Sequence, residues 1–314
     1  MKKYVQEATD ENIWTSIKNN TFGRNKDIKD FIDGLELIDE SACISLDAKW
    51  GDGKTFFVRQ IEEVLKYVLA NQRADEENPI EKLPSYEYLK DNEMMAKIDL
   101  KHSYLPIYYN AWMYDNHSDP LMSLLLVMTK TCRGVYDTKI DSEKISKKLV
   151  EALATLPISL GEFKANPFTA IEKLQGKSMD ILSLVQTEEE IRERVKGIFN
   201  DIIVERAQKL VIFIDELDRC RPSFAIEMLE RIKHYFDDER VIFVVSLNKE
   251  QLIHTITSYY GSGFDATRYL NKFFDVNINL PVMDRYQKQS IEFSEQRTER
   301  KSVSYTHLTL PTIA

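Results

Sequence analysis

With 314 residues, 43% hydrophobic and 30% charged, the chain is long enough to bury the core of one large α/β domain or two smaller ones. Its net charge of −9 argues against a surface that coats nucleic acid generally, although a local basic patch is compatible with it. The longest apolar run, residues 121–128, is far shorter than the roughly 20 residues that a bilayer requires. The first residues are not those of a signal peptide. We therefore expect a cytoplasmic protein without a transmembrane segment.

The chain begins with a polar N-terminal segment over residues 1–20. Residues 27–35 then carry apolar side chains at helical spacing, which predicts an amphipathic helix. Asn25, in the turn before this run, is the expected N-cap.

The next stretch has the pattern of a phosphate-binding loop. A short strand pattern at residues 43–47 leads into a glycine-containing turn, and an amphipathic helix pattern follows over residues 56–69. The glycines let the chain curl so that its backbone N–H groups point inward. Together with the positive end of the helix, these N–H groups would bind a polyphosphate. Lys54 would reach the β- and γ-phosphates, and the Thr55 hydroxyl would bind Mg²⁺. The expected nucleotide-contacting residues are Ala48, Lys49, Trp50, Gly51, Asp52, Gly53, Lys54, Thr55 and Phe56.

This loop departs from the usual motif in one place, because alanine replaces the first glycine at position 48. Alanine tolerates most turn conformations but not a strongly left-handed one, so the entry to the loop is expected to differ slightly. A glycine-containing turn before an ordinary helix is the alternative interpretation.

Two insertions are expected in the middle of the chain. Residues 72–102 are charged and contain two prolines, which indicates a surface insertion with a little helix. Residues 105–110 predict a second buried strand, and residues 120–131 the helix after it. Residues 133–207 are helical in pattern and polar on one face, and form the second insertion.

A second informative stretch is an apolar strand pattern that ends in acids at Asp215 and Glu216. Five consecutive apolar residues suit a strand buried on both faces of a parallel sheet, and such sheets bind ligands at their carboxyl ends. Asp215 would hold Mg²⁺, and Glu216 would orient and deprotonate the attacking water. A solvated strand end with a salt bridge is the alternative.

Later polar residues are weaker candidates. Asn248 follows the apolar strand at residues 241–247, and is either a sensor of the γ-phosphate or a helix N-cap. Arg268 shares a helix face with Lys272, and is either a phosphate contact or an ordinary solvent-exposed residue. Arg24 could flank the adenine or belong to a plain turn. Residues 276–281 alternate in polarity, which indicates an edge strand.

Five segments together carry a family resemblance: Trp50-Gly51-Asp52-Gly53-Lys54-Thr55, Tyr109-Asn110-Ala111-Trp112, Ile214-Asp215-Glu216-Leu217-Asp218-Arg219-Cys220, Tyr269-Leu270-Asn271-Lys272-Phe273-Phe274 and Leu280-Pro281. They resemble the KAP family of P-loop NTPases, within the additional-strand, catalytic-glutamate class that includes AAA+ and STAND proteins. The resemblance implies an α/β P-loop NTPase domain over residues 21–283. It also implies a central, mostly parallel sheet of about five strands sandwiched by helices, with another strand between the loop strand and the acidic one.

The chain departs from the family in two regions, the second insertion and the C-terminal region. Many members carry transmembrane helices where residues 133–207 are polar here. We expect residues 284–301 to begin a truncated C-terminal helical region, and residues 302–314 to be a non-native tail, because they show no helical period.

For function, the resemblance implies ATP rather than GTP, since no guanine-recognition motif is present. Mg²⁺ is the cofactor expected from Thr55 and Asp215. We expect an ATPase whose hydrolysis drives a conformational or assembly switch, with protein partners or self-association. The resemblance further implies a role in prokaryotic anti-phage defence. The main alternative is a nucleotide-binding signalling scaffold with negligible hydrolysis. A polynucleotide motor is disfavoured by the acidic charge, and a phosphotransferase by the lack of an evident acceptor site.

Overall fold

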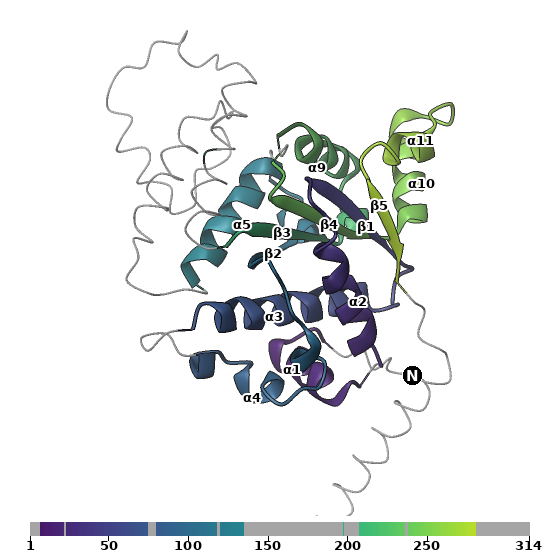
Figure 1. The fold of residues 1–314 in the computed structure, drawn as a ribbon. Coiled ribbons are helices and arrows are strands. Elements are labelled where there is room, and N and C mark those ends of the chain that lie inside the picture. The colour runs from purple at the N-terminus through teal and green to yellow at the C-terminus, as the bar shows by residue number, and fades with distance from the viewer. Residues whose placement is uncertain are drawn as a thin grey trace, which may run out of the picture.

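A computed structural model describes residues 7–134 and 207–280, apart from short gaps at 22, 75–79, 118–119 and 236–237, together with residue 197. Its centre is a five-stranded sheet in the order β2-β3-β4-β1-β5, and every pairing is parallel (Figure 1). The α/β fold expected from the sequence is therefore confirmed. The strands are β1 (Ala42–Asp47), β2 (Tyr104–Asn110), β3 (Lys209–Asp215), β4 (Val241–Leu247) and β5 (Val276–Asn279).

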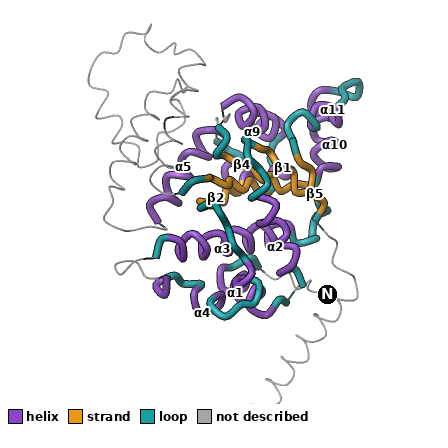
Figure 2. The backbone as a smooth tube through the Cα atoms, viewed as in Figure 1, coloured by secondary structure: helices purple, strands orange, loops and turns teal. Residues whose placement is uncertain are grey.

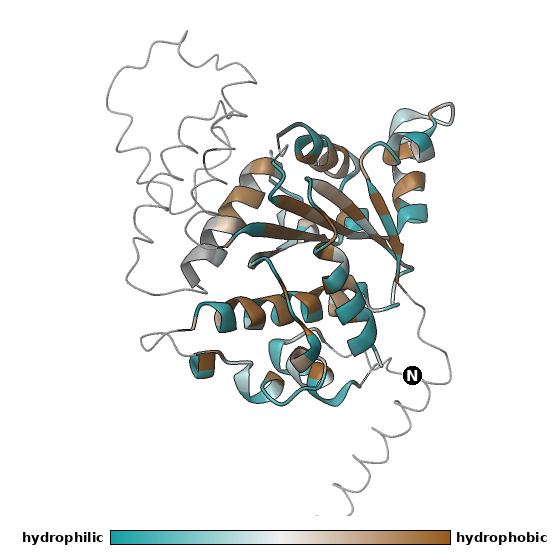
Figure 3. Ribbon diagram, viewed as in Figure 1, coloured by the Kyte–Doolittle hydropathy of each residue, from teal (hydrophilic) through white to brown (hydrophobic). Residues whose placement is uncertain are grey.

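Strand composition explains strand position. β3 and β4 are buried along their whole length, because their side chains are apolar on both faces and both faces are covered (Figure 3). β5 is mostly exposed, pairs only with β1 in the described sheet, and occupies the edge, as its alternation predicted. β4 lies between β1 and β3, so one strand separates the glycine-rich loop from the acidic strand end.

Helices cover the two faces of the sheet (Figure 2). The N-terminal helices and one face of the sheet share a core cluster, and the later helices share another with the opposite face. The first layer consists of α1 (Asp10–Asn19), α2 (Asn25–Leu35), α3 (Lys54–Gln72) and α4 (Tyr86–Leu89). The second consists of α5 (Pro120–Gly134), α9 (Pro222–Tyr235), α10 (Lys249–Tyr260) and α11 (Ala266–Leu270). Short 3-10 helices occur at η1 (Ile80–Lys82), η2 (Met95–Lys97), η3 (Ala111–Tyr114) and η5 (Leu217–Arg219).

The N-terminal region differs most from the sequence-based expectation. Within the stretch expected to be merely polar, α1 forms a helix capped by Thr9, whose side chain accepts from the Asn12 amide. Ile13 and Ile17 of α1 are completely buried in the core. The predicted cap at Asn25 is wrong: Arg24 occupies the N-cap position of α2 without a capping side-chain bond.

The stretch at residues 72–102 is a surface insertion only in part. It contains little helix, as expected, yet Leu89, Met94 and Leu100 are buried in the first core cluster. Asn92 donates from its side chain to the Ile17 carbonyl at 2.9 Å, which fastens the insertion to α1. Most of the second predicted insertion lies outside the described residues, as do the stretches 284–301 and 302–314.

Candidate functional site

The loop between β1 and α3 has the backbone that its glycines predict. Gly51 (φ 87°) and Gly53 (φ 83°) are both left-handed, a conformation that costs little only for glycine. Gly53 is also the N-cap of α3, so the left-handed turn leads directly into the first helical amides. The loop therefore presents unsatisfied N–H groups and the positive end of a 19-residue helix to any anion that it binds.

Lys54, the first residue of α3, folds its side chain back over this loop. Its Nζ donates to the carbonyl of Ala48 at 2.6 Å and of Lys49 at 3.2 Å, and the residue is only 9% exposed. Burial lowers the pKa of Lys54, and the surrounding carboxylates, of which Asp218 and Asp215 have the largest effects, oppose this shift. A phosphate in the loop would replace these two carbonyls as the partner of the amine.

Arg24 supports the same loop. Its guanidinium donates to the carbonyl of Asp52 at 2.9 Å and of Gly53 at 3.3 Å, and lies 5.8 Å from the ring centre of Phe57. Arg24 is 5% exposed, and burial lowers its pKa, against the effect of the nearby carboxylates Asp27 and Asp52. These hydrogen bonds explain why Arg24 is buried: it supports the backbone of the loop. A contact between Arg24 and adenine remains a prediction.

Asp215 is the last residue of β3 and is 1% exposed. β3 pairs with β4, which in turn pairs with β1, the strand that leads into the loop. It shares a face of the sheet with Phe213, two residues earlier, whose ring belongs to the core beneath α3. The Tyr108 hydroxyl donates to Oδ2 at 3.0 Å, and the Glu216 amide donates to Oδ1 at 3.0 Å. A solvated strand end is therefore the wrong description of Asp215.

Glu216 leaves the strand through a left-handed turn, with φ of 61°, which is uncommon for a residue other than glycine. Both oxygens of its carboxylate have partners: Asn110 Nδ2 donates to Oε2 at 3.2 Å, and Arg219 Nη1 lies 3.1 Å from Oε1. The Arg219 guanidinium also lies 5.5 Å from the ring centre of Trp112. Backbone strain of this kind concentrates at functional sites.

Trp50 connects the two halves of the site, and the sequence did not reveal this. Its indole Nε1 donates to Oδ2 of Asp218 at 2.5 Å, while the side chain remains 53% exposed. Asp218 is 6% exposed and belongs to η5, directly after the acidic pair. The glycine-rich loop and the end of β3 are therefore joined by a direct hydrogen bond.

The remaining candidates differ in position. Asn248 lies at the same edge, because β4 pairs with both β1 and β3, but its side chain caps α10 by accepting from the Gln251 amide at 3.2 Å. Arg268 is exposed on α11, which packs against α10. Among the described residues, no contact joins Arg268 to the loop. Thr55 occupies the first turn of α3, as the motif requires.

Five parallel strands, a glycine-rich loop between β1 and α3, and an acidic end of β3 one strand away define a P-loop NTPase fold. The model of the KAP family P-loop domain matches residues 24–307, so the chain belongs to the KAP family. Within the part that the structure describes, no helix combines the length and apolar character needed to cross a membrane.

Other comparisons are more distant. The solved structures that match include the Walker-type ATPase PABY2304 of Pyrococcus abyssi, at 12% identity and a TM-score of 0.39. That match covers 98% of this chain and 63% of the other, so the chain spans less than two thirds of that structure's length. No curated protein matches the sequence.

Proposed function

We propose that the protein is a Mg²⁺-dependent ATPase whose hydrolysis cycle drives a conformational or assembly switch. The observation that carries this proposal is the joining of a left-handed glycine loop to two acids at the end of β3 through the Trp50–Asp218 bond. Membership of a P-loop NTPase family supports nucleotide binding and hydrolysis. The loop would hold the phosphates through its amides and Lys54.

The residues present fit a magnesium ion. Asp215 offers a buried carboxylate, and Thr55 offers a hydroxyl in the first turn of α3. Mg²⁺ is usually bound by one or two protein oxygens together with phosphates and water, and these two residues could supply the protein oxygens. When bound, the ion would neutralise charge on the phosphates.

Glu216 is the proposed general base. It follows the metal-binding candidate directly, and its left-handed backbone turns its side chain towards Asn110 and Arg219. In this assignment Glu216 accepts the proton of the attacking water, and Asn248 contacts the γ-phosphate or that water from the adjoining strand. Arg24 and Arg268 are further candidates for contact with the nucleotide.

A second function, a nucleotide-binding signalling scaffold with negligible hydrolysis, is favoured by one observation. Both oxygens of the Glu216 carboxylate have protein partners, Asn110 and Arg219. A base held in this way would give slow turnover until a partner or self-association released it. Protein partners and a role in anti-phage defence are also part of our proposal, and rest on the family resemblance alone. A cytoplasmic location is proposed as well, because the longest apolar run is too short to span a bilayer.

The test is phosphate release and ATP binding by the full chain with Mg²⁺. Replacing Glu216 with glutamine should lower turnover by about a hundredfold or more while ATP still binds. Replacing Lys54 with alanine should impair both. Glu250→Gln and Lys97→Ala, at exposed positions, are the matched controls and should behave as wild type. Equal, slow release by all variants with intact binding would favour the scaffold, and absence of binding would contradict both functions.

A further inference from the structure

Tyr108 lies on β2 beneath the acidic end of β3. The strand register places Tyr108 opposite Phe213, two residues before Asp215, on the face that α3 covers. From there its side chain crosses diagonally, and its hydroxyl donates to Asp215 Oδ2 at 3.0 Å. An ionised carboxylate only accepts hydrogen bonds, so the Tyr108 hydroxyl is the donor in this contact.

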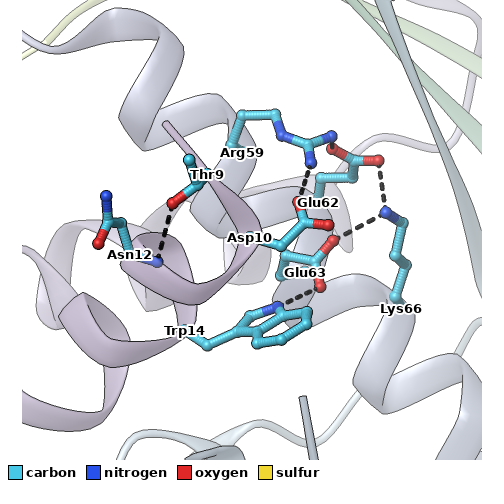
Figure 4. A network of polar contacts seen from close by, with 8 residues as sticks. All are labelled: Thr9, Asp10, Asn12, Trp14, Arg59, Glu62, Glu63 and Lys66. Carbon is cyan, nitrogen blue, oxygen red and sulfur yellow. Dashed lines mark hydrogen bonds and ion pairs between the residues drawn. The ribbon is translucent and has the colours of Figure 1, made fainter. Parts of the chain in front are cut away.

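The Tyr108 ring is held in turn by Arg59 on α3. The guanidinium carbon lies 4.8 Å from the ring centre, within the range of a cation–π contact. Arg59 pairs with Asp10 of α1 at 2.7 Å and also with Glu62 (Figure 4). The side chain that supports the tyrosine is therefore fixed from two helices.

The same network continues along α3 and into α1. Lys66 pairs with Glu62 at 2.7 Å and with Glu63 at 2.8 Å, and Trp14 donates from Nε1 to Glu63 at 2.6 Å (Figure 4). Glu62 and Glu63 are 3% and 5% exposed, so each buried carboxylate is compensated by a cation. The contacts give Arg59 little freedom to leave the Tyr108 ring.

We propose that Tyr108 is a positioning residue for metal binding, which fixes the orientation of the Asp215 carboxylate through its hydroxyl. The inference rests on the proposed function, because it requires Asp215 to hold Mg²⁺. The Glu216 amide holds one carboxylate oxygen and Tyr108 holds the other, so the plane of the carboxylate is set before the metal arrives. Each oxygen retains lone-pair capacity for the metal or its water. Groups that orient a metal ligand commonly change metal affinity by about 10- to 100-fold.

The test compares Tyr108→Phe with Tyr109→Phe in the full chain. The two substitutions remove one hydroxyl each from neighbouring residues of β2, but the Tyr109 hydroxyl contacts Ser123 at 2.7 Å within the opposite core. AMP-PNP, which is not hydrolysed, is titrated by calorimetry in EDTA and at increasing Mg²⁺. The affinity for Mn²⁺ in the presence of AMP-PNP is measured by electron paramagnetic resonance.

Tyr108→Phe should bind AMP-PNP in EDTA as wild type does, while its half-saturating Mg²⁺ and its Mn²⁺ dissociation constant rise about tenfold. Tyr109→Phe should change neither. Loss of metal-free binding by Tyr108→Phe, or unchanged metal affinity, would overturn the inference. Asp215→Asn separates the two proposals: if it weakens metal binding while Tyr108→Phe does not, only the inference fails. If Asp215→Asn has no effect, the proposed metal site itself is wrong, and the inference falls with it.

Discussion

Asn110 Nδ2 donates a hydrogen bond of 3.2 Å to Oε2 of Glu216, joining the ends of two adjacent strands. The proposed general base is therefore held by β2 on one side and by Arg219 on the other. These donors compete with an attacking water for the same carboxylate oxygens. The contacts that position Glu216 thus also restrain its reactivity.

Replacing Asn110 with alanine should accelerate basal ATP hydrolysis. Loss of one hydrogen bond to a charged group is worth about 1.5–3 kcal/mol. If all of it lowered the barrier, the rate of phosphate release would rise by about 10- to 160-fold, which sets the upper limit of the effect. ATP affinity should be unchanged, because among the described residues no contact joins Asn110 to the glycine-rich loop. A slower rate with unchanged affinity would instead show that the bond holds Glu216 in its productive position.

Arg24→Met should weaken both the fold and the site. The substitution keeps much of the apolar contact with Phe57, but leaves the Asp52 and Gly53 carbonyls without their donor. We expect the free energy of unfolding to fall by about 2 kcal/mol, the range for loss of charge-assisted hydrogen bonds. ATP affinity should fall about tenfold, as the loop loses its support. Denaturant unfolding and calorimetry measure the two effects, and an unchanged ATP affinity would show that the loop holds its shape without Arg24.

Two glycine substitutions should act in opposite directions. Gly53→Ala places a side chain at φ 83°, which costs about 1–2 kcal/mol, and brings its Cβ to 3.4 Å from Arg24 Nη1. Gly34→Ala lies in α2 with nothing within 4 Å of the added Cβ, and should stabilise the protein by about 0.5–1 kcal/mol. Thermal unfolding measures both changes. Equal changes in the unfolding temperature of the two variants would mean that the backbone at position 53 accommodates alanine without a cost in stability.

The strands were predictable because their signal is local. β4 matches its predicted bounds, since seven consecutive residues with buried side chains end at the polar Asn248. The P-loop and the acids of β3 were found for the same reason. For Asn248 the sequence left two roles open, and the geometry shows the capping bond.

The contacts that join the site could not be predicted in this way. Trp50 and Asp218 are 168 residues apart in the sequence, and Tyr108 and Asp215 are 107 apart. Local periodicity carries no information about such pairs, because only the strand order brings them together. α1 was missed for a different reason: only Ile13, Ser16 and Ile17 of its ten residues are buried, so its apolar stripe is narrow and its sequence is dominated by polar side chains.

The missed helix gives the last prediction. Ile17→Ala should lower the free energy of unfolding by about 2–4 kcal/mol, because Ile17 is fully buried and a cavity would remain beside the core. Leu37→Ala is the matched control: Leu37 is 83% exposed, so the change should stay within about 0.5 kcal/mol. Chemical denaturation of the full chain measures both. If Ile17→Ala behaves like the control, α1 does not belong to the folded core; if it destabilises as expected, the P-loop domain includes the N-terminal helix that the sequence left out.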